Sequence, residues 1–503
     1  MLPKLTTSAI QERMKALPHW RLSANGTAIE RHYLWRDFEQ ALAFMNALAR
    51  WAQQHNHHPD LRNVYNRVEL RLSTHDAGGL TDQDFAQARA AEQAAAQIQG
   101  ADGTPSTPPQ ALQGVRVIEM GQLIAGPFAA KTLGDFGAEV IKIEPPEGGD
   151  PLRQWRLLQD GTSVWWQVQS RNKRSIALDL RTPQGQDIAR QLIAGADVLI
   201  ENFRPGTLEA WGLGWETLKA LNPGLVMLRI SGYGQTGPYR DLPGFAAIAE
   251  AMGGLRHLTG EPGRVPVRCG VSIGDTLASL HGVIGVLTAL HHRRVNGGLG
   301  QVVDVALNEA VLNVMESLIP EYSAFGVVRE PAGSALPGIA PSNAYRCSDG
   351  TVLIAGNGDS IFKRLMQAIG RDDLAQDPEL AHNPGRVARV QEIDQAIEAW
   401  TLPHTVDRVV ADLQKAKVPV GKVYTARDIA QDPHYLERGM LLWQPTRDGH
   451  TVLVPGVVPK LLGTPGSVRS SAPKLGDDTR AILQELGMNE DTVARLRGAG
   501  VVA

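Results

Sequence analysis

The sequence predicts two different folds in one chain, an α+β unit at the N-terminus and a larger α/β unit after it. The first 97 residues combine an amphipathic helix with strands of alternating apolar and polar residues. The remainder repeats short apolar runs separated by helical stretches, which is typical of βαβ units. Between the two patterns, residues 96–114 concentrate Gly, Pro, Ser and Thr, as extended linkers do. We therefore expect a domain at 1–97, a linker at 98–112 and a second unit from residue 113.

In the N-terminal unit, apolar residues recur at helical spacing over 38–54, which predicts an amphipathic helix. Apolar and charged residues alternate over 67–72, which predicts a strand with one buried face. Thr81 and Asp84 have the spacing of a capping box and open an Ala-rich helix that runs to about residue 99. Two further strands are expected, at residues 20–22 and 29–34.

In the larger unit, four short runs of apolar, largely β-branched residues predict strands, at residues 114–120, 138–144, 196–202 and 225–231. Helical stretches at 127–137 and 183–195 separate them, which favours a parallel sheet covered on both faces. Ligands of such sheets bind at the carboxyl ends of strands, so residues 202–203 and 231–233 are candidates. The sequence contains no P-loop, and its one GxGxxG match, at residues 232–237, follows the fourth of these strands and not the first, so a classical dinucleotide site is not supported. We expect a large domain over 113–325, a smaller inserted domain over 326–400, and a return to the large domain over 401–503.

Composition narrows the functional classes. The 503 residues carry a net charge of -3, so no electrostatic argument supports binding to nucleic acid or an anionic membrane. The two cysteines, Cys269 and Cys347, argue against a disulfide scaffold and fit a reducing compartment. The N-terminus lacks the apolar segment of a signal peptide, and no run of ~18 apolar residues occurs. We therefore expect a cytoplasmic protein.

Four histidines lie between residues 55 and 75, and histidine is the side chain that exchanges protons most readily near neutral pH. Each of them alone could be a solvated surface residue. A metal site is the other alternative, but the adjacent His57 and His58 send their side chains in divergent directions, and no cysteine is near. The cluster therefore favours acid–base chemistry without a metal.

The segment around this cluster, HNHHPDLRNVYNRVELRLSTHDAGGLTDQD, resembles the pterin-4a-carbinolamine dehydratases, and the resemblance extends over residues 1–97. It implies a four-stranded antiparallel sheet with helices, a pterin as substrate, and dehydration of 4a-hydroxytetrahydropterin without a metal. The active-site histidines of the family correspond to His57, His58 and His75. His55 is left without a role.

The chemistry suits these residues because hydroxide is a poor leaving group. An acid must protonate the 4a-hydroxyl while a base takes the N5 proton, and both groups need pKa values near 7. We expect His58 and His75 to be this acid and base, in an order that stays open, and His57 to bind and orient the pterin. Gln53 and Gln54 stand where the family often has glutamate. The alternative is a non-catalytic dimerisation or binding module.

Residues 111–503 resemble the class III CoA-transferases, on the motifs LQGVRVIEMGQLIAGPFAAKTLGDFGAEVIKIEPP, NKRSIALDL, DVLIENFRPG and GYGQTGPY. The resemblance implies a Rossmann-like large domain, a smaller domain, and an interlocked homodimer that could assemble further. It implies an acyl-CoA donor, a small carboxylate acceptor and no metal. It also implies CoA contacts at Ile124, Ala125, Leu178, Arg181, Asn202, Phe203 and Tyr233.

The catalytic carboxylate of that family corresponds to Asp275. Apolar residues at helical spacing follow it, so Asp275 lies at a helix N-terminus, where the macrodipole and free N–H groups favour an ionised carboxylate. A carboxylate nucleophile has to be ionised. The alternative is that Asp275 only caps the helix.

Acyl-CoA racemases of the same superfamily are a further alternative. They carry a histidine in a Gly-His-Asp segment, and the corresponding residues here are Gly244, Phe245 and Ala246. Phenylalanine cannot transfer a proton, so a racemase is disfavoured.

Overall fold

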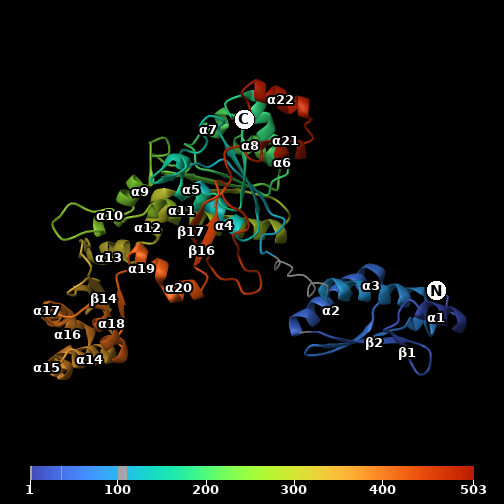
Figure 1. Ribbon diagram of the computed structural model, residues 1–503, viewed down its shortest axis with the longest axis horizontal. Coiled ribbons are helices and arrows are strands. Elements are labelled where there is room, and N and C mark those ends of the chain that lie inside the picture. The colour runs from blue at the N-terminus through green and yellow to red at the C-terminus, as the bar shows by residue number, and fades with distance from the viewer. Residues whose placement is uncertain (1–2, 36, 100–109) are drawn as a thin grey trace. The chain divides into compact units, whose positions relative to one another are not determined.

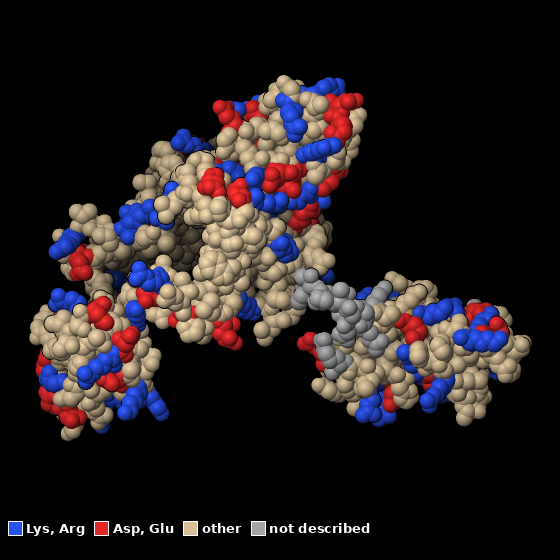
Figure 2. All heavy atoms as spheres, in the orientation of Figure 1, with Lys and Arg blue, Asp and Glu red and all other residues tan. Residues whose placement is uncertain are grey.

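The computed structural model in Figure 1 describes residues 3–35, 37–99 and 110–503. The chain forms two compact units, residues 1–108 and residues 109–503. Most of the expected linker, residues 100–109, lies outside the described residues. On the face shown in Figure 2, lysine and arginine side chains are interspersed with aspartate and glutamate. This mixing agrees with the near-neutral net charge.

The N-terminal unit is an antiparallel sheet with helices, as predicted. Its strand order is β1-β2-β4-β3, and each neighbouring pair is antiparallel. The strands are β1 (Arg21–Leu22), β2 (Ile29–Leu34), β3 (Asp60–Val64) and β4 (Arg67–Leu72). The helical elements are α1 (Thr7–Met14), α2 (Phe38–His55), η1 (His75–Ala77) and α3 (Asp82–Gln99). Strand β3 and helix α1 were not predicted.

One apolar cluster holds this unit together. Phe44 of α2 and Phe85 of α3 pack against Val68, Leu70 and Leu72, the alternate residues of β4. Each of these five side chains is at most 1% exposed. Both long helices therefore cover the same face of the sheet, which explains the alternation seen in the sequence. Strand β3 shows no such alternation because its residues are exposed or half-buried.

The larger unit contains a six-stranded parallel sheet with the order β12-β11-β10-β5-β6-β9. Read from the other edge, the strands follow the chain in the order 3-2-1-4-5-6, the Rossmann arrangement. The expectation of a Rossmann-like domain is confirmed. The predicted strands are β5 (Arg116–Glu119), β6 (Glu139–Glu144), β10 (Val198–Glu201) and β11 (Val226–Ser231). Two edge strands were missed, β9 (Lys173–Ala177) and β12 (Val302–Ala306).

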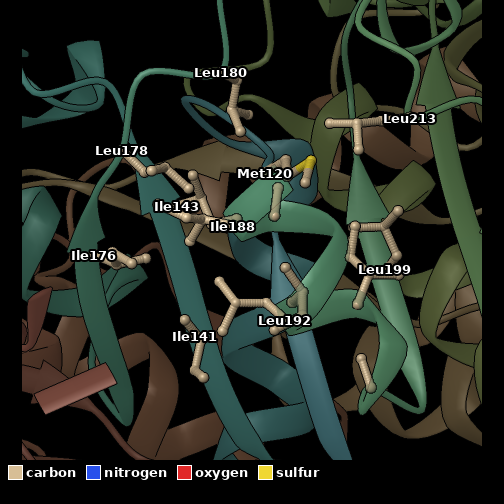
Figure 3. Close-up of a cluster of buried hydrophobic side chains, with 14 of the residues drawn as sticks. Met120, Ile141, Ile143, Ile176, Leu178, Leu180, Ile188, Leu192, Leu199 and Leu213 are labelled. Carbon is tan, nitrogen blue, oxygen red and sulfur yellow. The ribbon is translucent and has the colours of Figure 1, made fainter. Parts of the chain in front are cut away.

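Both faces of this sheet are buried, which explains the continuous apolar runs. Val117 and Val140 belong to a cluster that includes residues of α4 (Ala125–Asp135) and α11 (Ile273–Val295). Their sequence neighbours Ile118 and Ile141 belong to a second cluster. Figure 3 shows this second cluster, which includes residues of α6 (Pro183–Ala194) and α8 (Trp215–Leu221).

A smaller three-stranded antiparallel sheet has the order β13-β14-β15, from β13 (Ser342–Arg346), β14 (Thr351–Ala355) and β15 (Val420–Lys422). It shares an apolar cluster with residues of α14 (Asp359–Ala368), α17 (Val390–Thr401) and α18 (Val406–Lys415). Strand β15 lies beyond residue 400, so strand pairing extends this region past the expected boundary. The chain afterwards rejoins the parallel sheet, where Val502 bridges Leu178 and α21 (Thr479–Glu485) contacts β9.

The other elements connect these layers. The helices are α5 (Val164–Gln169), α7 (Thr207–Ala210), α9 (Ala246–Met252), α10 (Leu255–Leu258), α12 (Leu307–Asn313), α13 (Leu318–Phe325), α15 (Asp372–Gln376), α16 (Asn383–Ala388), α19 (Ala426–Gln431), α20 (Pro433–Glu437) and α22 (Glu490–Gly498), with short 3-10 helices η3 (Pro151–Gln154) and η4 (Pro378–Leu380). The strands are β7 (Leu158–Gln159), β8 (Thr162–Ser163), β16 (Leu441–Pro445) and β17 (Thr451–Pro455).

Helix α11 is the one helix among the described residues that is long and apolar enough to cross a membrane. It contacts α4, α12 and strand β11. Length and apolar composition alone are weak evidence for a membrane-spanning helix, because core helices share both properties.

Candidate functional site

Asp275 is the third residue of α11, after the N-cap Ser272, whose side chain makes no capping hydrogen bond. One turn further along, the Ser279 hydroxyl lies 2.7 Å from the carbonyl oxygen of Asp275 and 2.7 Å from that of Ala125. Ser279 therefore ties the first turns of α11 to the start of α4. Ile124 and Ala125, two of the predicted CoA contacts, are thus brought close to the nucleophile candidate.

The charge environment of Asp275 differs from the one expected. Burial raises its pKa to about 6, the negative charge of Glu250 adds to the rise, and Arg268 opposes it. The helix N-terminus favours the ionised form, whereas burial and the negative charge of Glu250 shift the pKa of Asp275 upward. At pH 7 the carboxylate is still largely ionised, and it is more basic than an ordinary aspartate. Both properties suit a nucleophile.

The loop from Gly121 to Ala125 is held from both sides of the point where the strand order reverses, between β5 and β10. From the β10 side, Asn202 accepts a hydrogen bond from the backbone N–H of Gln122 (2.7 Å) and donates one to its carbonyl (2.9 Å). From the other side, Asp150 accepts from the backbone N–H of Leu123 (3.0 Å), and the Lys142 ammonium donates to the Gly121 carbonyl (2.7 Å). In Rossmann-type sheets, ligands bind in the crevice at this reversal.

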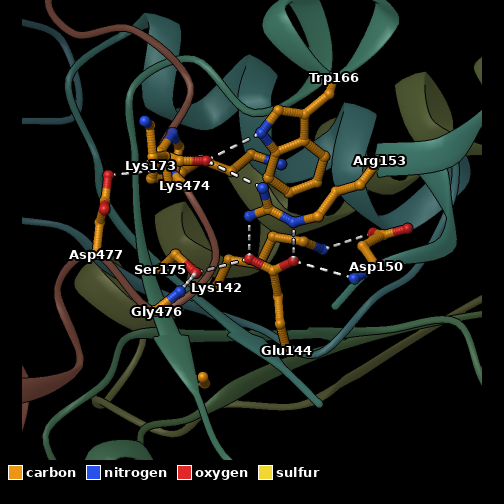
Figure 4. A network of polar contacts seen from close by, with 12 residues as sticks. Lys142, Glu144, Asp150, Arg153, Trp166, Lys173, Ser175, Lys474, Gly476 and Asp477 are labelled. Carbon is orange, nitrogen blue, oxygen red and sulfur yellow. Dashed lines mark hydrogen bonds and ion pairs between the residues drawn. The ribbon is translucent and has the colours of Figure 1, made fainter. Parts of the chain in front are cut away.

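Lys142 and Asp150, which hold that loop, belong to a buried ionic network (Figure 4). Lys142 has no exposed surface and lies 2.7 Å from Glu119 and 2.9 Å from Asp150. Burial opposes its charge, but the neighbouring carboxylates outweigh burial and raise the pKa of Lys142. Lys173 pairs with the other oxygen of Glu119 at 2.7 Å, and burial lowers its pKa to about 8. Because both ammonium groups are bonded to the protein, we interpret the network as the support of the loop.

The other predicted CoA contacts occupy different environments. Phe203, which follows β10, packs edge-on against Trp211 with ring centroids 5.3 Å apart. Tyr233, which follows β11, lies beside Tyr239 with centroids 5.9 Å apart. Arg181 is exposed, and its guanidinium donates two hydrogen bonds to the Asp179 carboxylate, of 2.8 and 3.0 Å.

In two of the predicted CoA contacts, the side chain is already engaged by the protein. Leu178 is 1% exposed and packs in the core, so its side chain does not reach solvent. Asn202 uses both ends of its amide on Gln122, so its hydrogen bonds position the loop.

Glu250 is a residue that sequence reasoning missed. It lies in α9, has no exposed surface, and accepts a hydrogen bond of 3.0 Å from Arg256. The available signal was a single charged residue within a run of small and apolar residues, AAIAEAM. Phe245, which replaces the histidine of the racemases, is the N-cap of the same helix and is 69% exposed.

In the N-terminal unit, His57 is buried, unlike the other histidines of the cluster. Its Nδ1 lies 2.7 Å from the Gln87 side-chain oxygen, and its Nε2 lies 3.2 Å from both the Thr74 hydroxyl and Asp84. Both ring nitrogens therefore have protein partners. The role expected for His57, to bind and orient the pterin, stays a prediction; in this structure its ring is held by these protein contacts.

His58 and His75 are exposed. They follow His57 and Thr74 in the chain, and the contact between His57 and Thr74 brings the two segments together. His55 is also exposed. Its ring stacks on that of Trp51, with centroids 4.0 Å apart, and its Nδ1 lies 2.9 Å from the Trp51 carbonyl oxygen. The described residues contain no group of three or more His, Cys, Asp or Glu side chains that could hold a metal ion.

Comparisons with known proteins match both units. Residues 112–479 match the family model described as CoA-transferase family III, and residues 3–94 match that of Pterin 4 alpha carbinolamine dehydratase. The chain is 49% identical to a succinyl-CoA–D-citramalate CoA-transferase of Chloroflexus aurantiacus, over 78% of this chain and 99% of that protein. It is 36% identical to a succinate–glutarate CoA-transferase of Agrobacterium fabrum, over 76% and 97%. A solved structure of a CAIB/BAIF family protein from Brucella suis covers 75% of this chain and 100% of that one, with 36% identity and a TM-score of 0.68.

Proposed function

The chain belongs to CoA-transferase family III, and from this we propose that Asp275 is the nucleophile that transfers CoA from an acyl-CoA to a carboxylic acid. The observation that carries the proposal is the position of this carboxylate. It lies at the start of α11, is mostly buried yet largely ionised at neutral pH, and is tied through Ser279 to the loop at the sheet reversal.

The proposed reaction proceeds through covalent intermediates on Asp275. The carboxylate attacks the thioester carbonyl, the C–S bond breaks, and CoA leaves as the thiolate, so a mixed anhydride forms. The thiolate attacks the aspartyl carbonyl of this anhydride, which releases the donor acid and leaves an aspartyl-CoA thioester. The acceptor carboxylate attacks that thioester and forms a second anhydride. The released thiolate then attacks the acceptor carbonyl, which yields the product thioester and regenerates Asp275.

The names of the relatives suggest the substrate class. They use succinyl-CoA or succinate with citramalate, malate or glutarate, all of which are dicarboxylates. We therefore propose succinyl-CoA as donor and a small dicarboxylate as acceptor for this chain.

Incubation of the full-length protein with succinyl-CoA tests the nucleophile. We expect a covalent CoA adduct that hydroxylamine releases, located by peptide mass spectrometry at Asp275 and absent in Asp275→Asn. Asp241→Asn is the matched control because the Asp241 side chain is 80% exposed and pairs with Arg240. An adduct that persists in Asp275→Asn would contradict the proposed mechanism.

The proposed assembly is the interlocked homodimer implied by the family. Helix α11 leaves four large apolar side chains more than a third exposed, namely Leu280, Ile284, Leu287 and Val295. Apolar surface of this kind is typical of subunit interfaces. Sedimentation equilibrium of the full chain should give at least twice the monomer mass, and a monomer would contradict this assembly.

The N-terminal unit supports a second proposed activity, dehydration of a 4a-hydroxytetrahydropterin. The observation that favours it is the His57–Thr74 contact, which joins the segments carrying the exposed His58 and His75. One of these two would protonate the 4a-hydroxyl while the other takes the N5 proton, so that the C–O bond breaks and water leaves. A non-catalytic binding or dimerisation module is the alternative.

A dehydratase assay on the full chain distinguishes a catalytic N-terminal unit from a non-catalytic binding or dimerisation module. We expect turnover that is lost in His58→Ala and in His75→Ala and is retained in His55→Ala. Wild-type protein that neither turns over nor binds a pterin would support the binding or dimerisation module.

A further inference from the structure

Glu250 is a buried carboxylate of which only one oxygen has a hydrogen-bond partner among the described residues. It has no exposed surface, and one of its oxygens accepts from the Arg256 guanidinium at 3.0 Å. Its other oxygen, Oε1, is buried and has no hydrogen-bond partner among the described residues. Leaving a buried carboxylate oxygen unpaired costs free energy, and aspartate, glutamate and lysine are rarely buried unless they are paired. A residue that only stabilised the fold would not need this arrangement.

The side chain of Glu250 lies against the backbone that carries Asp275. A Cβ atom placed on Gly274, the residue before Asp275, would lie only 3.3 Å from Cγ of Glu250 and 3.3 Å from Cβ of Ala246. Helices α9 and α11 therefore approach closely at this point. The absence of a side chain at Gly274 leaves room for the Glu250 side chain beside the first turn of α11.

The other charged groups around the pair are few. Arg256, in α10, is 24% exposed and bonds Glu250, and Arg268, in the loop before α11, is exposed and opposes the effect of Glu250 on Asp275. Helix α12 packs on both α9 and α11 and contributes Glu309, which is exposed. Along α11 itself, His281 bonds the Leu277 carbonyl and lies 3.1 Å from Asn313. Among the described residues, Glu250 is thus the one buried carboxylate whose charge acts on Asp275.

We propose that Glu250 is a positioning residue that keeps Asp275 basic enough to attack a thioester. The inference rests on the proposed role of Asp275 as nucleophile. A fixed negative charge beside Asp275 disfavours its ionised form and makes it a stronger base. The same charge favours each step in which Asp275 loses its charge to form an anhydride or a thioester. Glu250 would therefore act on acylation and not on the binding of CoA.

The pH dependence of CoA transfer tests this proposal. The variant Glu250→Gln removes the charge and keeps an oxygen that accepts from Arg256. We expect the acidic limb of kcat/KM, about pH 6 in the wild type, to move down by roughly half a pH unit or more. Because Asp275 stays buried in this variant, the acidic limb of kcat/KM should remain above the pKa of a free aspartate. Above pH 8, kcat should decrease about 2- to 10-fold because the carboxylate is less basic.

Two variants control for structural effects. Glu250→Asp keeps the charge and should retain the wild-type limb, and Glu309→Gln removes an exposed carboxylate from a neighbouring helix and should change nothing. Thermal melts of each variant report folding. If Glu250→Gln is folded, still forms the covalent adduct at Asp275 and shows an unmoved limb, the inference is wrong while the proposed nucleophile stands. If wild-type protein forms no adduct, the proposed function itself fails.

Discussion

The two units place their reactive groups in opposite environments. In the N-terminal unit, the exposed His58 and His75 lie on segments that the buried His57 joins through Thr74. In the larger unit, Asp275 is itself mostly buried, and its pKa is raised to about 6. Imidazole titrates near neutrality without help, whereas an aspartate in water is a weak base at that pH. The proposed role of Asp275 therefore depends on an environment that changes its basicity.

The residues that support the two candidate sites also differ in the kind of contact they make. His57 is held by three neutral or acidic partners, Gln87, Thr74 and Asp84. The loop beside Asp275 is held by buried ion pairs that include Lys142. A buried ion pair is strongly destabilising when only one partner is removed. The larger unit should thus be much more sensitive to single substitutions in its framework.

The largest expected effect tests whether the two sites are independent. Asp275→Asn should reduce CoA transfer about 10⁴-fold because the nucleophile is lost. Dehydratase turnover by the same protein should stay within twofold of the wild type. Parallel assays of both activities on one preparation provide the measurement. A matching loss of dehydratase activity would mean that the two sites are coupled.

The next effect concerns the buried ion pairs. Lys142→Met should destabilise the larger unit by about 3–5 kcal/mol, since Glu119 and Asp150 lose a shared cation in a buried position. Lys474→Met is the control because Lys474 is 55% exposed, and it should cost less than about 1 kcal/mol. Urea unfolding followed by hydrogen exchange in each unit measures both. An equal loss of unfolding free energy in the two variants would show that the buried ionic network contributes little to stability.

In the N-terminal unit, substitution of His57 should affect mainly stability, whereas substitution of the adjacent His58 should affect mainly activity. His57→Ala removes a buried hydrogen-bonded ring and should destabilise this unit by about 1–3 kcal/mol. His58→Ala should change stability by less than about 0.5 kcal/mol, while it removes dehydratase activity. Thermal melts of the two variants, with the assay, decide between these outcomes. If His58→Ala were the more destabilising of the two, the assignment of roles would be reversed.

The last effect depends on pH. The folded pKa of Asp275 is raised to about 6, so its contribution to stability is full below the unfolded pKa of 3.8 and is lost as pH rises through 6. Asparagine resembles the neutral form, so Asp275→Asn should stabilise the larger unit at pH 8 by about 1–3 kcal/mol and have little effect at pH 4. Urea unfolding at both pH values measures the difference. Stabilisation of the same size at both would show that the charge of Asp275 is not the cause.

The sequence was sufficient for the elements whose pattern repeats. The four central strands of the parallel sheet are continuous apolar runs because both of their faces are buried, and β4 alternates because only one of its faces is. Strands β9 and β12 were missed because edge strands have weaker patterns; Lys173 is buried in β9 only because Glu119 pairs with it. The residues of the candidate sites were predicted from motifs, which carry no information on burial.

By itself, the sequence determined that two units with different folds share this chain, and that Asp275 begins a helix and three histidines flank a strand. Tertiary structure decided what surrounds these residues. It buried His57 and left His58 and His75 exposed, and it brought Glu250 against Gly274 through the packing of two helices. The helix N-terminus alone favours a more acidic Asp275, whereas burial and Glu250 raise its pKa. The physical reason is that a dipole at a helix end is a local property, whereas desolvation and the proximity of a second carboxylate depend on contacts between residues distant in the chain.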